Sequence, residues 1–208
     1  MRDIDDMLSQ VMPFAPNAPE PLVLRHIREI AREFCQVAKV WREREEFEIS
    51  SPTCIGIIGS DDKAIVEIES ASLNDRKLDP VTVGWLNDNR PQWNDDADHP
   101  ESTAIYITQL TPNTITVTPR ESGTVRAMLV LQPSLTAQSL PDLLFDVHLT
   151  TIARGVASRV LITPGADFAN PQLGLTLYNE FLGNRSTAKT VATKGQQGAR
   201  LRTKGDWL

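Results

Sequence analysis

LVLQPSLTAQSLPDLLFDVHLTTIARGVASRVLITPGADFANPQLGLTLYNEF, the stretch from Leu129 to Phe181, decides the fold of this 208-residue chain. An apolar strand is predicted to run into Gln132-Pro133-Ser134. Ser139-x-x-Asp142 has the pattern of a capping box, with Pro141 early in the helix that follows. Apolar residues then recur at helical spacing until Pro164-Gly165, a pair that ends helices. The first part of the stretch therefore predicts a strand that leads into one long helix.

A second helix is predicted to open at Asn170-Pro171, because asparagine is a good N-cap and proline a good first helical residue. Gly155, near the middle of the first helix, would let a neighbouring helix approach closely. The stretch is thus interpreted as a strand followed by a helix hairpin. The residues that start and end its helices form no catalytic motif, which favours a role in assembly over a catalytic role.

A long helix is predicted towards the N-terminus, from about Pro21 to about Glu46. Its apolar residues recur at steps of three and four and form a wide stripe. A stripe of this width is typical of a helix that packs against more than one neighbour, as in a bundle. The residues of the stripe are Val23, Leu24, Ile27, Ile30, Ala31, Phe34, Val37, Ala38 and Trp41.

Between Phe47 and Gln132 the pattern changes to short runs rich in valine, isoleucine and threonine. Turn signals such as Leu73-Asn-Asp75 separate the runs. Apolar and polar residues alternate in several of them, which predicts half-buried antiparallel strands in a small sheet or barrel. The predicted strands are Cys54–Ile58, Ala64–Glu69, Val81–Leu86, Thr103–Gln109, Thr114–Thr118 and Thr124–Leu131.

The net charge of −6 excludes a generally nucleic-acid-binding composition, but the charge is unevenly spread. From Gly183 to Leu208 there are six basic side chains and one acidic one, a net charge of +5, so the remainder carries −11. A basic tail on an acidic body suggests that the tail docks on an acidic partner or a neighbouring copy. The alternative for the tail is a disordered terminus.

The two cysteines, Cys35 and Cys54, have no metal-ligand spacing and predict neither a disulfide framework nor a zinc site. No apolar run approaches the length of a membrane span, and the acidic N-terminal segment lacks a signal-peptide core. We therefore expect no membrane association and synthesis in a cytoplasm.

The sequence contains no motif that identifies catalytic, cofactor-binding or metal-binding residues. His26, His99 and His148 fall in separate segments, and a structural hydrogen bond is the expected use of His148. No nucleophile elbow, P-loop or dinucleotide fingerprint is present. The acidic loop from Asn87 to Ser102 could hold calcium, but it lacks the spaced Asp-x-Asp-x-Asp-Gly pattern and is interpreted as a solvated or interface loop. The sequence predicts a protein that is not an enzyme.

Several motifs resemble the head-to-tail adaptor (connector) proteins of short-tailed phages, the family of tail tubular protein A. The first helix carries Arg28, Glu33-Phe34-Cys35 and Trp41, and Pro133-Ser134 and Leu140-Pro141-Asp142 follow the last strand. Ile152-Ala153, Gly155, Arg159, Leu161 and Pro164-Gly165 match the family's next helix, and Asn170-Pro171 and Tyr178 match its last. The chain departs from the family's pattern at three positions. Phe181 comes one residue earlier than the family's phenylalanine. Val160 stands where the family more commonly has leucine, and Phe168 stands where it often has tryptophan. The likeness covers most of residues 1–190 and is most specific in the C-terminal half.

The resemblance implies an α+β fold, with a helical bundle formed by the N- and C-terminal segments and an inserted antiparallel β-domain. The implied segments are residues 1–46 (N-terminal helical segment), 47–132 (β-sheet or barrel domain), 133–182 (C-terminal helix hairpin) and 183–208 (basic C-terminal arm). The arm would dock on the portal protein. The docking residues would be Arg200, Arg202, Lys204, Trp207 and Leu208.

The resemblance also implies a virion protein of the tail or neck, assembled in the host cytoplasm. It would form a homo-oligomeric ring, usually a dodecamer, between the portal protein and the tail nozzle or tail tube protein, with tail fibres as further possible partners. DNA would pass through the lumen without sequence-specific binding. The alternative kept open is a small-ligand-binding or enzymatic β-domain with helical flanks. A host-takeover or DNA-binding protein is disfavoured by the acidic body.

Overall fold

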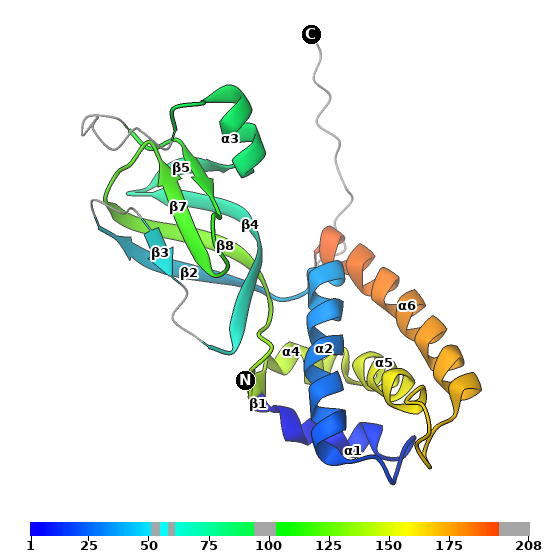
Figure 1. Cartoon of the computed structure of the whole chain (residues 1–208). Coiled ribbons are helices and arrows are strands. Elements are labelled where there is room, and N and C mark those ends of the chain that lie inside the picture. Colours follow the sequence, from blue (N-terminus) through cyan, green and yellow to red (C-terminus); the bar gives the residue numbers. More distant parts are fainter. Residues whose placement is uncertain (51–54, 58–60, 94–102, 196–208) are drawn as a thin grey trace. The chain divides into compact units, whose positions relative to one another are not determined.

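A computed structural model of the chain describes residues 1–50, 55–57, 61–93 and 103–195 (Figure 1). The chain divides into two compact units. Unit 1 comprises Met1–Val40 and Leu135–Leu208, and unit 2 comprises Trp41–Ser134.

Unit 1 is mainly helical. Its strands β1 and β9 pair in antiparallel fashion and join the start of the chain to the segment before the hairpin. Its elements are β1 (Arg2–Asp3), the 3-10 helix η1 (Ile4–Met7), α1 (Leu8–Val11), α2 (Glu20–Ala38), β9 (Ser139–Leu140), α4 (Asp142–Asp146), α5 (Leu149–Leu161) and α6 (Pro171–Lys194).

Helix α2 ends eight residues before the predicted end at Glu46. Lys39 takes the left-handed conformation (φ 52°), and its N–H donates to the carbonyl of Cys35, which closes the helix. Arg42–Ile49 forms strand β2 instead. This segment, REREEFEI, contains residues with good helix propensity, but Phe47 and Ile49 alternate with exposed residues and are buried in the sheet. Strand pairing and burial override local propensity here.

The predicted single helix after Pro141 is two helices. α4 ends at Asp146, and α5 begins at Leu149 with His148 at its N-cap. The capping-box prediction is wrong, because Ser139 lies in β9 and the N-cap position of α4 is Pro141. The cap at Asn170 is confirmed: its Oδ1 accepts a hydrogen bond from the Leu173 N–H at 3.1 Å.

The core of unit 1 lies where α2, α5 and α6 pack together. Gly155 of α5 sits at the closest approach: a Cβ atom there would lie 2.8 Å from Ile30 Cγ2 and 2.8 Å from Phe181 Cδ2. The predicted role of Gly155 in close helix packing is therefore confirmed. The fully buried residues of the three helices include Val23, Ile27, Ile30, Phe34, Cys35, Ala38, Ile152, Val156, Ala157, Val160 and Phe181.

Unit 2 is a curled mixed sheet with the strand order β2-β8-β4-β5-β6-β7-β3. β5 and β6 pair in parallel, the other pairs are antiparallel, and β3 also contacts β2. Its further elements are β3 (Ile55–Ile57), β4 (Lys63–Leu73), β5 (Arg76–Pro80), α3 (Val83–Asn89), β6 (Tyr106–Thr108), β7 (Thr114–Thr118) and β8 (Gly123–Pro133).

The turn predicted at Leu73-Asn-Asp75 is confirmed. Asn74 and Asp75 both have positive φ angles, 49° and 65°, and they join β4 to β5 as a two-residue hairpin. The strand predicted at Val81–Leu86 is wrong, because Val83–Asn89 is helix α3. Thr82 caps this helix by accepting a hydrogen bond from the Trp85 N–H.

The predicted fold class is wrong in its arrangement. Strands are spread along the chain from Arg2 to Leu140 and are not confined to a β-domain inserted into a helical bundle. The sheet of unit 2 is mixed and not antiparallel, and it carries a helix between β5 and β6. Two-residue strands such as β1 and β9 are too short to leave a periodic pattern in the sequence.

Candidate functional site

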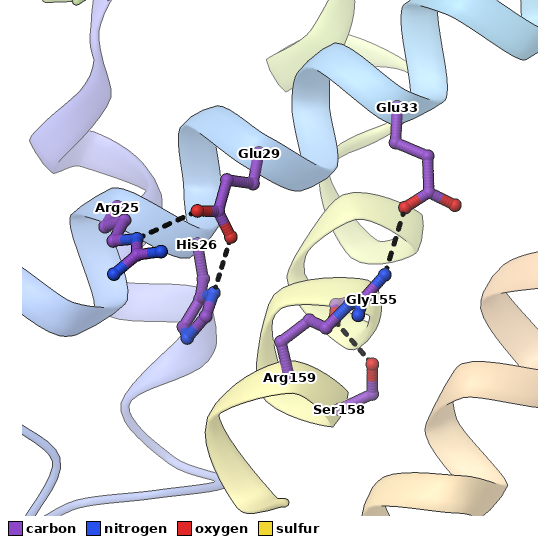
Figure 2. A network of polar contacts seen from close by, with 7 residues as sticks. All are labelled: Arg25, His26, Glu29, Glu33, Gly155, Ser158 and Arg159. Atoms are coloured by element: carbon purple, nitrogen blue, oxygen red, sulfur yellow. Dashed lines mark hydrogen bonds and ion pairs between the residues drawn. The ribbon is translucent and has the colours of Figure 1, made fainter. Parts of the chain in front are cut away.

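A carboxylate shared by two arginines ties the three long helices of unit 1 together. Glu33 of α2 forms ion pairs with Arg159 of α5, at 3.4 Å, and with Arg185 of α6. Each guanidinium also lies over an aromatic ring of α6, Arg159 over Tyr178 at 5.5 Å and Arg185 over Phe181 at 5.4 Å. Figure 2 shows Glu33 and Arg159 reaching toward each other from their helices. We call these three charged residues the Glu33 clamp; it fixes how the helices meet.

A second polar network lies along α2 (Figure 2). Glu29 accepts hydrogen bonds from Arg25 Nε at 2.8 Å and contacts His26 Nδ1 at 3.0 Å. Burial would raise the pKa of Glu29, but the hydrogen bonds from Arg25 and His26 outweigh it and hold that pKa below its usual value. The side chain of His26 is only 16% exposed and lies against Glu29. The network pairs the charges of Arg25 and Glu29 along α2.

Two small residues bring the ends of α5 and α6 together. A Cβ atom on Gly174 of α6 would lie 3.1 Å from the carbonyl oxygen of Ser158, so the two backbones are in close approach. The Ser158 hydroxyl is buried and donates to the Gly155 carbonyl at 2.6 Å, which leaves it inside the helix and away from any base (Figure 2). Ser158 is therefore a packing residue.

An apolar groove follows from this close approach. It has a volume of about 190 Å³ and is lined by Ser158, Arg159, Ile162, Gly174, Leu175 and Tyr178. Ile162 is 47% exposed and Leu175 is 61% exposed. We call this feature the hairpin groove. Exposed apolar side chains gathered around a concave surface are typical of sites that bind another protein.

His148 is half-buried, and its ring packs against the ring of Phe34 with the centroids 4.9 Å apart. A structural hydrogen bond was expected for this residue, and the contact that the structure gives it is with an aromatic ring. Burial lowers the pKa of His148 below its ordinary value.

The pH dependence of stability tests this environment. Because the folded pKa of His148 is lowered, the unfolded chain binds the proton first as the pH falls. The stability that neutral His148 contributes is present above the ordinary pKa of about 6.5 and is lost as the pH falls through that value towards the lower folded pKa. We expect the denaturant midpoint to drop over this window, and to drop less in a His148→Phe variant, which keeps a ring beside Phe34. Equal pH slopes in the two proteins would contradict the assignment.

Unit 2 carries most of the acidic excess of the chain, with sixteen acidic and eight basic residues between Trp41 and Ser134. Many charges pair across strands: Lys63 contacts both Glu43 and Glu45, and Arg126 contacts both Glu46 and Asp75. Burial would lower the pKa of Lys63, but its hydrogen bonds to the two glutamates raise it overall. These pairs link β2 and β8 to β4 and to the β4–β5 turn across the sheet.

A cavity of about 430 Å³ lies in unit 2 between β4, the β5–α3 connection and β6. Its walls are mixed, with Ile68, Val81 and Ile107 as apolar members and Glu67 and Gln109 as polar ones. Nearby, Trp85 of α3 packs on Tyr106 of β6 at 5.1 Å, and the guanidinium of Arg90 lies 5.3 Å from the Tyr106 ring. The cavity brings together no pair of groups that resembles an acid–base or nucleophile arrangement.

The predicted portal-docking residues Arg200, Arg202, Lys204, Trp207 and Leu208 lie outside the described residues, as do Cys54, His99 and the acidic residues Asp95, Asp96, Asp98 and Glu101. Cys35 is fully buried, which raises the pKa of its thiol well above the ordinary value. Among the residues that the structure describes, no three His, Cys, Asp or Glu side chains gather as a metal site would require. Within the same residues, no helix has the length and apolar content needed to cross a bilayer.

The Glu33 clamp and the hairpin groove were not predicted. Glu33 and Arg159 each belong to a motif that carries the resemblance, but their pairing depends on the register of helices that are more than 100 residues apart in sequence. The groove depends on Gly174. The only feature of the sequence that could have predicted it is a small residue in the first turns of an otherwise leucine-rich helix.

A scan of the chain against protein-family models finds no match, and a search of curated proteins finds no significant match.

Proposed function

We propose that this chain is a structural virion protein, a head-to-tail adaptor that forms a ring between the portal protein and the tail nozzle, with DNA passing through the ring. The observation that supports this proposal best is that the C-terminal residues resembling the adaptor family, where the likeness is most specific, build one packed feature, the α5–α6 hairpin. Ile152, Ala153 and Gly155 are buried within it, and Asn170 caps its second helix. These residues act in packing and in capping, as expected for a rigid structural part of an assembly.

The surface of unit 1 supports the same role. Large apolar side chains are exposed near both ends of α5, including Val147 at 62% and Leu175 at 61%. Exposed apolar side chains that gather in patches are typical of surfaces covered by a partner. A ring of identical copies covers two different surfaces of each copy by repeating one heterologous contact.

The charge distribution fits a channel through which DNA passes without being bound tightly. Binding to the DNA backbone needs many lysine and arginine contacts. Unit 2 is strongly acidic, and basic residues concentrate after Gly183. We therefore assign the basic segment to a protein partner, the portal, and expect no sequence-specific DNA binding.

The second candidate function is small-ligand binding by unit 2, which is favoured by its cavity of about 430 Å³. Ligand pockets commonly have volumes of about 300–1,000 Å³. A ligand that raised the melting temperature of the purified chain, and did so less for an Ile107→Trp variant that fills the cavity, would favour this candidate.

Location in the particle tests the proposal. The chain is tagged, incorporated into phage particles, and labelled with gold for electron microscopy. We expect the label at the neck, between head and tail. A label spread through the host cell extract, with none on particles, would contradict the adaptor role.

Removal of residues 195–208 tests the role of the basic arm. The deletion leaves all of α6 in place, so we expect the melting temperature to change little. Portal binding, measured by co-sedimentation, is expected to weaken because the arm supplies positive charge and an apolar tip. As a control, residues 195–208 are replaced by a Gly/Ser linker of the same length, which separates the effect of composition from the effect of length. Equal portal binding by the full and truncated chains would contradict the prediction.

A further inference from the structure

We propose that unit 2 binds an extended, neutral or basic peptide segment of a partner protein as an additional strand between β4 and β6. The segment would occupy the cavity of about 430 Å³, which begins where β5 ends. We call this part of the cavity the strand slot. The inference is independent of the adaptor role, and it gives the cavity a peptide as its occupant in place of a small molecule.

The strand slot exists because β5 stops short of its two neighbours. β5 pairs with β4 only over Ala71–Leu73, so Lys63–Ser70 of β4 pairs with β8 on one side and with no strand that the structure describes on the other. The Val81 N–H donates to the Ile107 carbonyl at 3.0 Å, and Pro80 before it therefore faces β4, where proline has no N–H to donate. The chain then leaves the sheet for α3, and one strand position stays open.

Both walls of the strand slot are strand edges with main-chain groups directed into it. The Ile107 carbonyl points toward β5, and main-chain groups alternate in direction along a strand, so those of Gln109 point into the slot beyond the end of β5. In the described ranges no strand pairs with Gln109. On β4, the Ile65 N–H donates to the side-chain oxygen of Asn113 at 3.0 Å. Asn113, in the β6–β7 turn, thus holds the position of a strand carbonyl at the far end of the slot.

The spacing of the walls fits one extended chain. Adjacent strands lie about 4.8 Å apart, so β4 and β6 are about 10 Å apart where β5 lies between them. The register of β4 shifts between Ile65 and Glu67 and again between Ile68 and Ser70, and such bulges bend a strand. The open stretch of β4 between Ile65 and Ala71 has room to pair with about four residues of an extended peptide.

The side chains of the walls restrict the sequence of the occupant. Ile68, Val81 and Ile107 are apolar, and Glu67 is the only charged side chain among the described lining residues. Unit 2 as a whole has twice as many acidic as basic residues. A segment in which apolar residues alternate with basic or neutral polar ones matches these walls, whereas an acidic segment does not. In strand addition of this kind, main-chain hydrogen bonds supply affinity and alternate side chains supply specificity.

Two sets of synthetic octapeptides, immobilised on a membrane and probed with the full-length chain, test this inference. In the first set valine, isoleucine or threonine alternates with lysine, arginine or glutamine, and in the second set aspartate and glutamate replace the basic residues. We expect binding to members of the first set only. The tightest binder is then measured by fluorescence polarisation with one N-methyl group at a time. N-methylation of a central residue should weaken binding about fivefold or more, because it removes a main-chain donor, and N-methylation of a terminal residue should change it little.

Two variants at one position separate main-chain from side-chain recognition. Gln109→Pro removes the N–H that points into the strand slot, and Gln109→Ala removes only the side chain. Thr108 before it lies in β6, the extended conformation that a residue before proline prefers, so the proline variant should fold. We expect Gln109→Pro to bind the peptide about fivefold or more weakly and Gln109→Ala to bind it like the wild type. Ile68→Trp, which fills the slot from a half-buried position on β4, should also abolish binding, and its melting temperature shows whether it is folded.

Each contrary result would overturn the strand slot. Failure of both peptide sets to bind would do so, and so would equal binding of the basic and acidic sets. Peptide binding that persists in folded Gln109→Pro and Ile68→Trp variants would place the peptide elsewhere on the chain. None of these results depends on where the chain lies in a particle, so the adaptor role stands or falls on its own test.

Discussion

Replacing Phe181 by alanine is expected to lower the free energy of unfolding of unit 1 by about 3–5 kcal/mol. Phe181 is fully buried, and its ring lies 6.3 Å from the rings of both Phe34 and Tyr178. It also supports the Arg185 guanidinium of the Glu33 clamp. The truncation therefore leaves a cavity in the core between α2, α5 and α6.

Denaturant unfolding followed by far-ultraviolet circular dichroism measures this loss through the helices. Tryptophan fluorescence gives a second signal weighted to unit 2, which contains Trp41, Trp85 and Trp93. The control is Leu175→Ala on the same helix, which should change stability by no more than about 0.5 kcal/mol because Leu175 is exposed. A loss below about 1 kcal/mol for Phe181→Ala would show that the three helices do not pack as described.

Replacing Gly155 by leucine is expected to cost about 3 kcal/mol or more, since no space exists for the side chain. Even a Cβ atom would approach Ile30 Cγ2 and Phe181 Cδ2 to 2.8 Å. The χ1 angle of an isoleucine in a helix is stiff, so Ile30 cannot readily turn away. Gly155→Ala should be milder, because the better helix propensity of alanine returns about 1 kcal/mol of the overpacking cost.

Gly183 on α6 provides the matched control. A Cβ atom there would meet nothing within 4 Å, so Gly183→Ala should stabilise the protein by about 0.5–1 kcal/mol through helix propensity alone. Thermal unfolding of the two alanine variants compares them directly. If both shifted the melting temperature upward, the close helix approach at Gly155 would be disproved.

The parts of the fold that the sequence predicted well are those with local signals. Asn170-Pro171 predicts the start of α6, and both the cap and the first residue are confirmed. Gly155 predicts a close helix approach because only a glycine leaves that space. Leu73-Asn-Asp75 predicts a turn, and the structure places a turn there, with positive φ angles at Asn74 and Asp75.

The errors arise where distant segments outweigh local propensity. Arg42–Glu46 has the composition of a helix but pairs with β8 as a strand. Val81–Leu86, with its valines, tryptophan and leucine, was predicted to be a strand, yet Thr82 caps helix α3, which begins at Val83. The parallel pairing of β5 with β6 joins segments separated by α3, and no local pattern reports such a partner.

The candidate site was less predictable than the fold. The Glu33 clamp joins residues 126 and 152 positions apart, and the hairpin groove depends on which face of α6 packs against α5. Both depend on how each helix is rotated about its axis relative to its neighbours. A stripe of apolar residues in the sequence leaves that rotation uncertain by a fraction of a turn. The basic arm was predicted from composition, and its named residues lie outside the described part of the chain.

The mass of a mixture of this chain with the portal protein of a short-tailed phage tests the proposed adaptor role most directly. Native mass spectrometry of the portal ring is compared before and after addition of the purified 23.1 kDa chain. The proposed adaptor role predicts one added species, a complete ring of identical copies, with partly filled rings scarce because each contact between neighbouring copies favours the next. A portal ring of unchanged mass beside free 23.1 kDa chains would contradict it.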